Sequence, residues 1–227
     1  MINSIEKEKE LAAKEAIKFI NNNQIVGLGT GSTAAYAIKG IGELVKNGLK
    51  IKAIPTSNRT KEMAILLNIP LIDINTIDSI DVSIDGADEF DSKLNLIKGG
   101  GGALLREKIV ASLTKELIII VDSTKKVDTL GKFKLPIEVI PFASNYVLKK
   151  VQFLNGEGKI RMLGDTEFIT DEGNYIIDVD FGLISDPIYL SSKLNEIEGI
   201  VSHGLFIKLA RKVIMGNNDT TISFESK

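Results

Sequence analysis

Three segments of the sequence combine glycines, hydroxyl groups and charged side chains at spacings that suit the handling of an anionic substrate. They read GLGTGST at residues 27–33, DGADEFD at residues 85–91 and KGGGGALLREK at residues 98–108. Glycines let backbone N–H groups approach an anion closely, and a helix that begins directly after them adds the positive end of its dipole. Carboxylates can transfer protons, and lysines can stabilise developing negative charge.

The segment at residues 27–33 favours binding of a phosphate or carboxylate, with a plain strand-to-helix turn as the alternative. Thr30, Ser32 and Thr33 add hydroxyl donors to the backbone amides. A Walker loop is excluded because no Gly-Lys-Ser/Thr follows. A dinucleotide fingerprint is disfavoured, since Ser32 stands where the third glycine belongs. About twenty positions further on, where that fingerprint has an acid, residues 55–57 read PTS.

The segment at residues 85–91 places four carboxylates within seven residues. Like charges at such short spacing repel one another and are costly to bring together. The segment indicates either the binding of sugar hydroxyls with proton transfer or a divalent cation site, although its spacing does not match an EF-hand loop. A solvated acidic turn explains it equally well.

The segment at residues 98–108 places Lys98 before four glycines and Glu107 in the first turns of a predicted helix. The glycines offer backbone N–H groups, Lys98 offers a cation, and a glutamate can serve as a general base near neutral pH. The alternative is a flexible glycine hinge followed by an exposed helical glutamate. For Glu107 taken alone, that alternative is favoured because exposed helical glutamates are so common.

The composition excludes several classes of site. The 227 residues include 28 Lys and Arg against 30 Asp and Glu, a formal net charge of −2, which disfavours a nucleic-acid partner. No Cys and a single His exclude disulfides, a Cys nucleophile and a poly-His zinc site. The longest apolar run, near residues 117–121, is too short for a membrane span, and the charged N-terminus lacks a secretory signal. We therefore expect a cytoplasmic protein with no membrane partner.

Short apolar runs alternate with helical segments up to residue 121, which predicts an α/β fold with a Rossmann-like, open, mainly parallel sheet and helices on both faces. Ligands bind beyond the carboxyl ends of the strands in such sheets, where all three segments fall. From Gly131 onward the order strand–helix–strand–strand–helix–strand predicts a smaller inserted α+β domain of ferredoxin-like type. The expected domains are a catalytic domain of residues 1–130 and 206–227 and a small domain of residues 131–205. The sequence also predicts a strand at residues 71–74 and a hairpin of residues 167–170 with 175–181.

In this order, the three segments resemble ribose-5-phosphate isomerases of type A. The resemblance continues through PTS at residues 55–57, VDSTKKVDTLGKFKLPIEVIP at 121–141 and DVDFGLISDP at 178–187, and it covers essentially the whole chain. It implies an aldose–ketose isomerase that interconverts D-ribose 5-phosphate and D-ribulose 5-phosphate in the non-oxidative pentose phosphate pathway. It also implies that no metal or other cofactor is needed, and that the chain forms a homodimer, with a tetramer as the alternative.

The resemblance also assigns roles. It makes Glu107 the general base, gives acid–base work and hydroxyl binding to Asp85 and Asp88, and makes Lys98 a catalytic cation. The transfer of a proton between C1 and C2 proceeds through an enediolate intermediate, so one carboxylate can both remove and return the proton. A cation and backbone amides stabilise the oxyanion of this intermediate. The residues expected to bind substrate are Thr30, Gly31, Ser32, Thr33, Asp85, Gly86, Ala87, Asp88, Lys98, Gly99, Gly100, Gly101 and Lys125.

Two positions depart from the pattern of the family. Gly102 makes a fourth glycine where three followed by Ala are expected, and Leu105 stands where a small polar residue is common. Both bear on the glycine loop and on the setting of Glu107. The alternative functions are a non-catalytic sugar-phosphate sensor and a related sugar-phosphate isomerase or deaminase on the same fold. The enzyme is favoured by the presence of Glu107, Asp85, Asp88 and Lys98, because a sensor needs a phosphate loop but no base.

Overall fold

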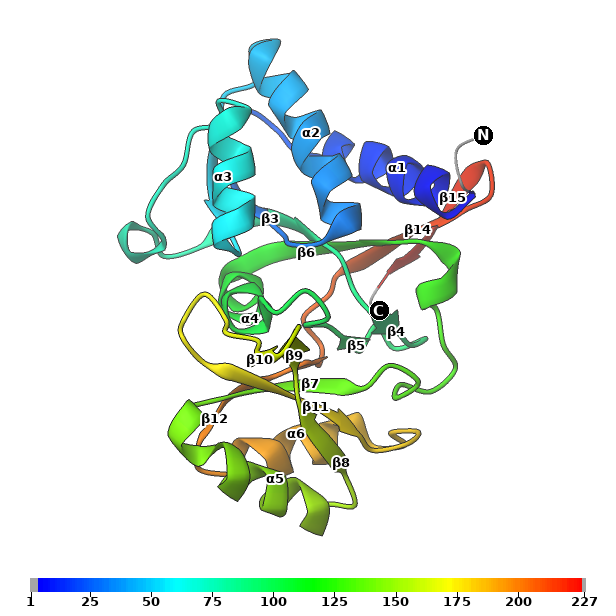
Figure 1. The fold of residues 1–227 in the computed structure, drawn as a ribbon. Helices are drawn as coiled ribbons and strands as arrows, with labels where there is room; N and C mark the ends of the chain where they lie inside the picture. The colour runs from blue at the N-terminus through cyan, green and yellow to red at the C-terminus, as the bar shows by residue number, and fades with distance from the viewer. Residues whose placement is uncertain (1–3, 226–227) are drawn as a thin grey trace. The chain divides into compact units, whose positions relative to one another are not determined.

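The computed structural model describes residues 4–225, which form two compact units. The first unit contains residues 4–87, 106–126 and 208–225, and the second contains residues 88–105 and 127–207. Each unit has its own sheet and its own apolar core, and the elements can be followed by label in Figure 1. The domains expected from the sequence stay a prediction. The segment 88–105 groups with the second unit.

The first unit is built on a six-stranded sheet in the order β15-β14-β6-β3-β1-β2. All neighbouring strands pair in parallel except β14 and β15, which are antiparallel. This confirms the open, mainly parallel sheet. The strands are β1 (Ile25–Leu28), β2 (Lys52–Pro55), β3 (Ile80–Asp85), β6 (Thr114–Val121), β14 (Lys212–Asn217) and β15 (Thr220–Glu225).

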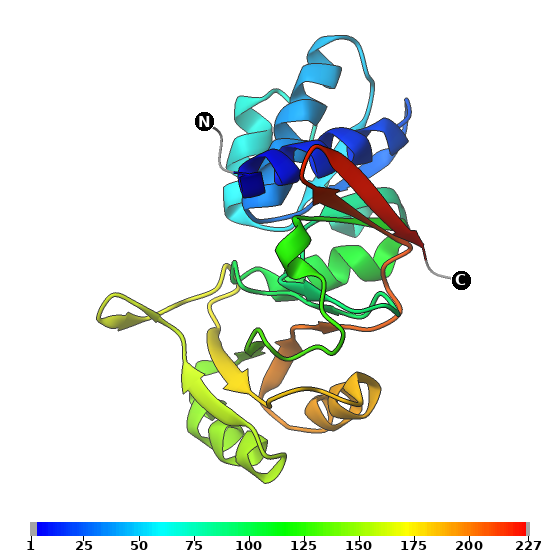
Figure 2. The ribbon, with the colours of Figure 1, turned by 90° about the vertical axis from the view of Figure 1, so that its right-hand side faces the viewer.

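Helices cover both faces of this sheet because its strands are apolar on both sides. Val26 and Leu28 point into a core shared with α1 and α2, whereas Ile25 packs with Ile54 and Val110 of α4 on the other face. The five residues of β6 at 117–121 are each at most 2% exposed, which explains their nearly continuous apolar run. Figure 2 shows α1 (dark blue) alongside β15 (red). The helices are α1 (Ser4–Ala16), α2 (Ser32–Lys46), α3 (Asn58–Leu66) and α4 (Leu104–Leu113).

The second unit contains a four-stranded antiparallel sheet in the order β12-β7-β11-β8. Along the chain its elements run strand, helix, strand, strand, helix, strand, which confirms the predicted α+β pattern. A short three-stranded sheet, β13-β5-β4, belongs to the same unit. The elements of the larger sheet are β7 (Leu135–Val139), α5 (Ser144–Phe153), β8 (Glu157–Ile160), β11 (Tyr175–Asp180), α6 (Pro187–Asn195) and β12 (Ile200–His203). Those of the smaller sheet are β4 (Glu89–Phe90), β5 (Leu96–Ile97) and β13 (Leu205–Phe206).

The expected strand at residues 71–74 is wrong. Leu71 makes only an isolated parallel bridge with Ala53, and Ile74–Thr76 forms a 3₁₀ turn. The Asp73 side chain accepts a hydrogen bond from the Asn75 amide at 2.9 Å. This local side-chain bond competes with a sheet ladder and turns the chain away from the strand edge.

The expected hairpin of residues 167–170 with 175–181 is also wrong in its pairing. Only Ile169 and Tyr175 bridge, while β10 (Thr166–Glu167) pairs with β9 (Met162–Leu163). The true partner of β11 on this side is β8. Its sequence, EGKI, alternates between exposed and half-exposed positions and carries too little apolar signal to be recognised as a strand.

None of the helices in the described part of the chain is long and apolar enough to cross a membrane.

One carboxylate of the acidic segment anchors a loop of the second unit. Glu89 is 3% exposed, and its oxygens accept hydrogen bonds from the amides of Gly131 at 2.8 Å and Phe133 at 2.5 Å. These bonds fix the chain just before β7. Buried carboxylates persist when they are satisfied in this way, and such charged hydrogen bonds are stronger than neutral ones.

Glu89→Ala is expected to lower the free energy of unfolding by about 3 kcal/mol, because two backbone N–H groups lose a charged acceptor. Urea unfolding followed by circular dichroism measures this loss. The exposed carboxylate of Asp128 is a control from the same stretch of chain, and Asp128→Ala should change stability by less than about 0.5 kcal/mol. Equal stabilities of the two variants would show that Glu89 does not anchor the loop.

A second buried carboxylate makes stability depend on pH. Glu138 on β7 is 1% exposed, and burial raises its pKa above the ordinary value of 4.5 despite hydrogen bonds from Asn174 and Thr170. The folded chain therefore holds this proton more tightly than the unfolded chain. Its contribution favours folding at low pH and is lost as the pH rises from 4.5 through the raised value.

Glu138→Gln should remove this loss, since the amide stays neutral and its oxygen can still accept from Asn174 and Thr170. Weakening of the hydrogen bond from the Leu105 backbone would lower the melting temperature without adding a dependence on pH. The melting temperature of the variant minus that of the wild type is expected to increase by a few degrees between about pH 4 and pH 7. Thermal melts at several pH values give this difference. Glu157→Gln, at an exposed position on β8, should give a flat difference. A flat difference for Glu138→Gln as well would contradict the prediction.

Candidate active site

The glycine–threonine segment lies between the end of β1 and the start of α2, as its sequence predicts. Gly29 is required by close approach, since a Cβ there would lie 2.2 Å from the Asp85 carboxylate on β3. Gly31 precedes the first residue of α2, Ser32, and both are exposed. The N–H groups at the start of α2 have no partners within the helix, so this end can bind an anion.

A cluster of hydroxyl groups supports this segment. Thr30 Oγ1 lies 2.7 Å from Thr56 Oγ1, 2.9 Å from Ser57 Oγ and 3.2 Å from Thr60 Oγ1. Thr60 Oγ1 also donates to Gly29 O at 3.0 Å, and Thr56 Oγ1 donates to Leu28 O at 3.0 Å. The hydroxyl of Thr30 thus takes part in fixing the loop.

Thr56, Ser57 and Thr60 were not expected as site residues. The PTS segment could have indicated the first two of them, because it puts hydroxyl groups at the end of β2, which lies next to β1 in the parallel sheet. Ser57 in addition caps α3 by accepting from the Thr60 amide at 3.1 Å. Thr60 is one helical turn further on, and its part in the cluster follows from this cap.

Asp85 ends β3 and is brought beside the glycine–threonine segment. It is 4% exposed, and its Oδ1 accepts from the amides of Thr30 at 3.1 Å and Gly86 at 2.7 Å. The structure therefore joins the first two sequence segments through a buried, ionisable group. Gly86 and Ala87 follow it at half-buried positions.

Glu107 lies in the first turn of α4 and is 5% exposed. The alternative of an exposed helical glutamate is therefore wrong. A carboxylate at the N-terminal end of a helix is favoured by the helix dipole. Exclusion of water strengthens its electrostatic interactions with a bound substrate. On the same helix, burial lowers the pKa of Lys108 to about 7.

Lys98 follows β5 in the second unit and is 2% exposed. Its amide donates to Gly204 O at 2.9 Å, and its ammonium lies 5.5 Å from the centre of the Phe206 ring. An aromatic face is one of the few apolar surfaces that stabilises a buried cation. The sequence placed this lysine at a strand end, and the structure agrees.

The glycine-rich segment after Lys98 is a turn held by side chains, not an open hinge. Gly102 N donates to Gly99 O at 3.0 Å, and Gly100 N donates to Asp88 Oδ2 at 2.8 Å. Gly102 has φ +80°, and a Cβ there would lie 2.4 Å from the Phe168 ring. The fourth glycine is thus required by the local backbone and by close packing.

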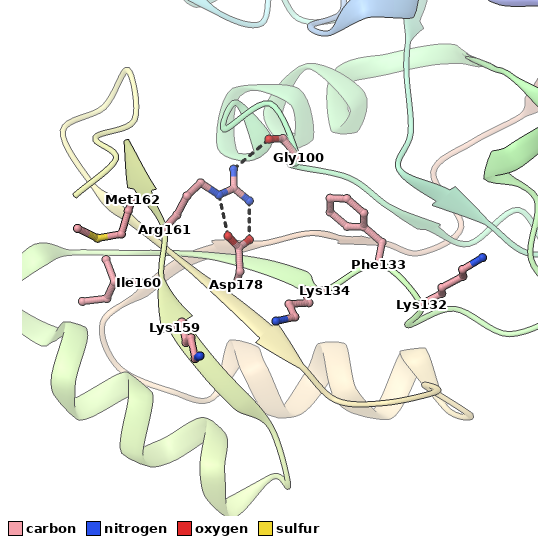
Figure 3. Close-up of a pocket in the computed structure, with 9 residues that line it drawn as sticks. All are labelled: Gly100, Lys132, Phe133, Lys134, Lys159, Ile160, Arg161, Met162 and Asp178. Atoms are coloured by element: carbon pink, nitrogen blue, oxygen red, sulfur yellow. Dashed lines mark hydrogen bonds and ion pairs between the residues drawn. The ribbon is translucent and has the colours of Figure 1, made fainter. Parts of the chain in front are cut away.

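Arg161 and Asp178 hold the same turn and were missed by the sequence analysis. Arg161 Nη1 donates to Gly99 O at 3.0 Å and to Gly100 O at 3.1 Å. Its Nε and Nη2 donate to the Asp178 carboxylate at 2.9 and 2.5 Å, and Figure 3 shows these two bonds with the bond to Gly100. Arg161, Gly100 and Asp178 line a pocket of about 660 Å³ with three lysines. No sequence signal links residues so far apart along the chain.

The four carboxylates of the acidic segment separate into different tasks. Asp85 faces the glycine–threonine segment and Asp88 faces Gly100, as described above, whereas Glu89 anchors a loop. Asp91 accepts from the amides of Lys93 at 2.8 Å and Asn95 at 2.9 Å within its own turn. Among residues 4–225, no group of three or more histidine, aspartate or glutamate side chains is arranged to hold a metal ion.

Lys125 ends a 3₁₀ turn (Ser123–Lys125) that follows β6 in the first unit. Its amide donates to Asp122 O at 3.2 Å, and its side chain is half-buried. Glu8 of α1 supports the turn by accepting from the Ser123 amide at 2.9 Å and from the Asn218 amide at 2.8 Å. Burial alone would raise the pKa of Glu8, but these amide donors hold it below the ordinary value.

The expected site residues are thus distributed over both units. Within the first unit, Asp85 contacts the loop at Thr30, and within the second, Asp88 contacts Gly100. The first unit carries Thr30, Gly31, Ser32, Thr33, Asp85, Gly86, Ala87, Glu107 and Lys125, and the second carries Asp88, Lys98, Gly99, Gly100 and Gly101. The single histidine, His203, is 2% exposed in β12.

Comparison with known proteins agrees with the resemblance seen in the sequence. The family profile described as Ribose 5-phosphate isomerase A (phosphoriboisomerase A) matches residues 52–220. A ribose-5-phosphate isomerase A of Picrophilus torridus is 49% identical over 94% of this chain and 95% of its own length.

Solved structures agree as well. A D-ribose-5-phosphate isomerase in complex with phospho-erythronic acid superposes with a TM-score of 0.94 at 43% identity, over 97% of this chain and 99% of the other. Ribose 5-phosphate isomerase A of Methanocaldococcus jannaschii gives a TM-score of 0.91 at 40% identity, over 96% and 97% of the two chains. The fold and most of the sequence are therefore shared, and the chain belongs to the ribose 5-phosphate isomerase A family.

Proposed function

We propose that the protein interconverts D-ribose 5-phosphate and D-ribulose 5-phosphate, with Glu107 as the general base. Membership of the family supports the reaction. The observation that carries the choice of an enzyme over a sensor is the burial of Glu107 at the start of α4, where it is 5% exposed. A general base is more effective when it is kept from water, whereas a sensor needs the phosphate loop and no base at this position.

The reaction balances with a single carboxylate base. Glu107 removes the proton from C2 of the open-chain aldose, which leaves an enediolate with negative charge on O1, and returns that proton to C1. The hydroxyl proton on O2 moves to O1, so that O2 becomes the ketone oxygen and O1 becomes a hydroxyl. Negative charge develops on the oxygens of C1 and C2. Lys98 and the backbone N–H groups that follow it are the donors that stabilise this charge.

The local geometry supports the remaining proposed roles. The N-terminal end of α2, with Gly31, Ser32 and Thr33, binds the phosphate through backbone N–H groups and hydroxyls. Thr30 contributes to this subsite by holding the loop in place, since its amide bonds to Asp85 and its hydroxyl bonds to Thr56 and Ser57. Lys125 adds a further cation to substrate binding.

The sugar itself is bound by the acidic segment and the glycine turn. Asp85 and Asp88 accept hydrogen bonds from sugar hydroxyls and exchange protons with the sugar when the furanose ring opens. The amides of Gly86 and Ala87 lie between these two residues in the chain. Lys98 and residues 99–101 bind around C1 and C2. We further propose that the protein acts in the cytoplasm, in the pentose phosphate pathway, as a homodimer, without cofactor and without a nucleic-acid partner.

The first test is the conversion of ribose 5-phosphate to ribulose 5-phosphate by the purified protein, with a chelator present and no nucleotide added. Turnover well above the uncatalysed rate is expected, since the proposed groups all come from the chain. Activity that appears only after a divalent metal is restored would overturn the metal-free mechanism. Binding of ribose 5-phosphate without turnover would favour the sensor.

Glu107→Gln is expected to lower kcat by about 10³-fold and to leave KM within a few-fold of wild type, because the amide has nearly the same shape but cannot accept the proton. Steady-state kinetics with ribose 5-phosphate separates the two parameters. Glu62→Gln, at an exposed position on α3, is the matched control and should retain full activity. A Glu107→Gln enzyme with near-normal kcat would remove Glu107 from the role of base.

A further inference from the structure

A single guanidinium group fixes two successive carbonyl groups of the glycine turn. Arg161 Nη1 donates to Gly99 O at 3.0 Å and to Gly100 O at 3.1 Å. Its Nε and Nη2 both bind Asp178, as Figure 3 shows together with the bond to Gly100. The ring of Phe168 lies 5.8 Å from the guanidinium carbon. Most of the donors of Arg161 are thereby used, and the planar group has one orientation.

The planarity of the peptide bond transfers this orientation to the amides of the turn. In a trans peptide the C=O and the N–H of the next residue point in opposite directions. Because Gly99 O and Gly100 O both face Arg161, the N–H groups of Gly100 and Gly101 both point away from it. The Gly100 N–H meets Asp88 Oδ2 at 2.8 Å. The N–H of Gly101 has no acceptor among the described residues, and Gly101 is exposed.

We propose that Arg161, anchored by Asp178, is a positioning residue of the reaction, which aims the Gly101 N–H at the oxyanion that develops on the substrate. The inference rests on the proposed function. Glycine has more backbone freedom than any other residue, so four in succession would otherwise sample many orientations. A peptide flip would present a carbonyl oxygen to the oxyanion in place of a donor.

Arginine suits this task better than lysine. Its planar fork binds two carbonyl oxygens and a carboxylate at once, whereas an ammonium is a compact point charge on a flexible stem. The loss of Arg161 should therefore weaken stabilisation of the transition state more than binding of the substrate. That pattern lowers kcat and leaves KM nearly unchanged.

The test is the kinetics of Arg161→Lys and Arg161→Ala with ribose 5-phosphate, together with their melting temperatures. Both variants should lose about 10²-fold in kcat, the size of effect seen when one oxyanion donor is removed, with KM within about threefold. Guanidinium chloride, added to Arg161→Ala below the concentration that unfolds it, should restore part of the lost kcat. Ammonium chloride should not.

Lys159→Ala is the matched control, because Lys159 lines the same pocket and is exposed. It should keep wild-type kcat and KM. A raised KM at unchanged kcat in the Arg161 variants would overturn the positioning role. So would a loss of activity that follows the loss of folded protein and does not respond to guanidinium.

The wild-type protein in the same assay separates this inference from the function on which it rests. An inactive wild type overturns the isomerase and the positioning role together. An active wild type with unaffected Arg161 variants overturns the positioning role alone.

Discussion

The loops of this protein depend on carboxylates that accept hydrogen bonds from backbone N–H groups. Asp85 holds the amides of Thr30 and Gly86, and Glu89 holds those of Gly131 and Phe133. Loop amides have no sheet or helix partner, so each must find an acceptor. A buried carboxylate accepts charge-assisted hydrogen bonds from these amides, and the amides in turn offset the cost of burying its charge.

This arrangement also explains how four carboxylates can stand within seven residues. Each is directed to a different set of donors, so the like charges are screened locally and do not share one site. Glu89 and Asp91 serve the chain around them, whereas Asp85 and Asp88 each contact a glycine-rich segment. The separate sets of donors thus account for the density of acidic residues in this segment.

The sequence predicted elements that depend on neighbouring residues, but not contacts between residues far apart in the chain. Apolar periodicity predicted β6 and the parallel sheet, and the GLGTGST pattern predicted the turn into α2. The strand β8 was missed because its exposed, charged residues conceal its pairing with β11. Arg161 was missed because the carbonyl groups that it binds lie about sixty residues earlier in the chain. A side-chain contact with a backbone oxygen places no demand on the identity of the partner residue.

Glycine-rich segments solve one problem for an enzyme and create another. They allow backbone N–H groups to approach an anion, but they also have the largest conformational freedom to lose. Both segments here are fixed by side chains from elsewhere in the same unit, the hydroxyl cluster around Thr30 in one and Arg161 in the other. Electrostatic stabilisation of a transition state depends on donors that are already oriented before charge develops. In the proposed reaction the glycines allow the close approach, and these polar side chains fix the orientation of the N–H groups that the approach requires.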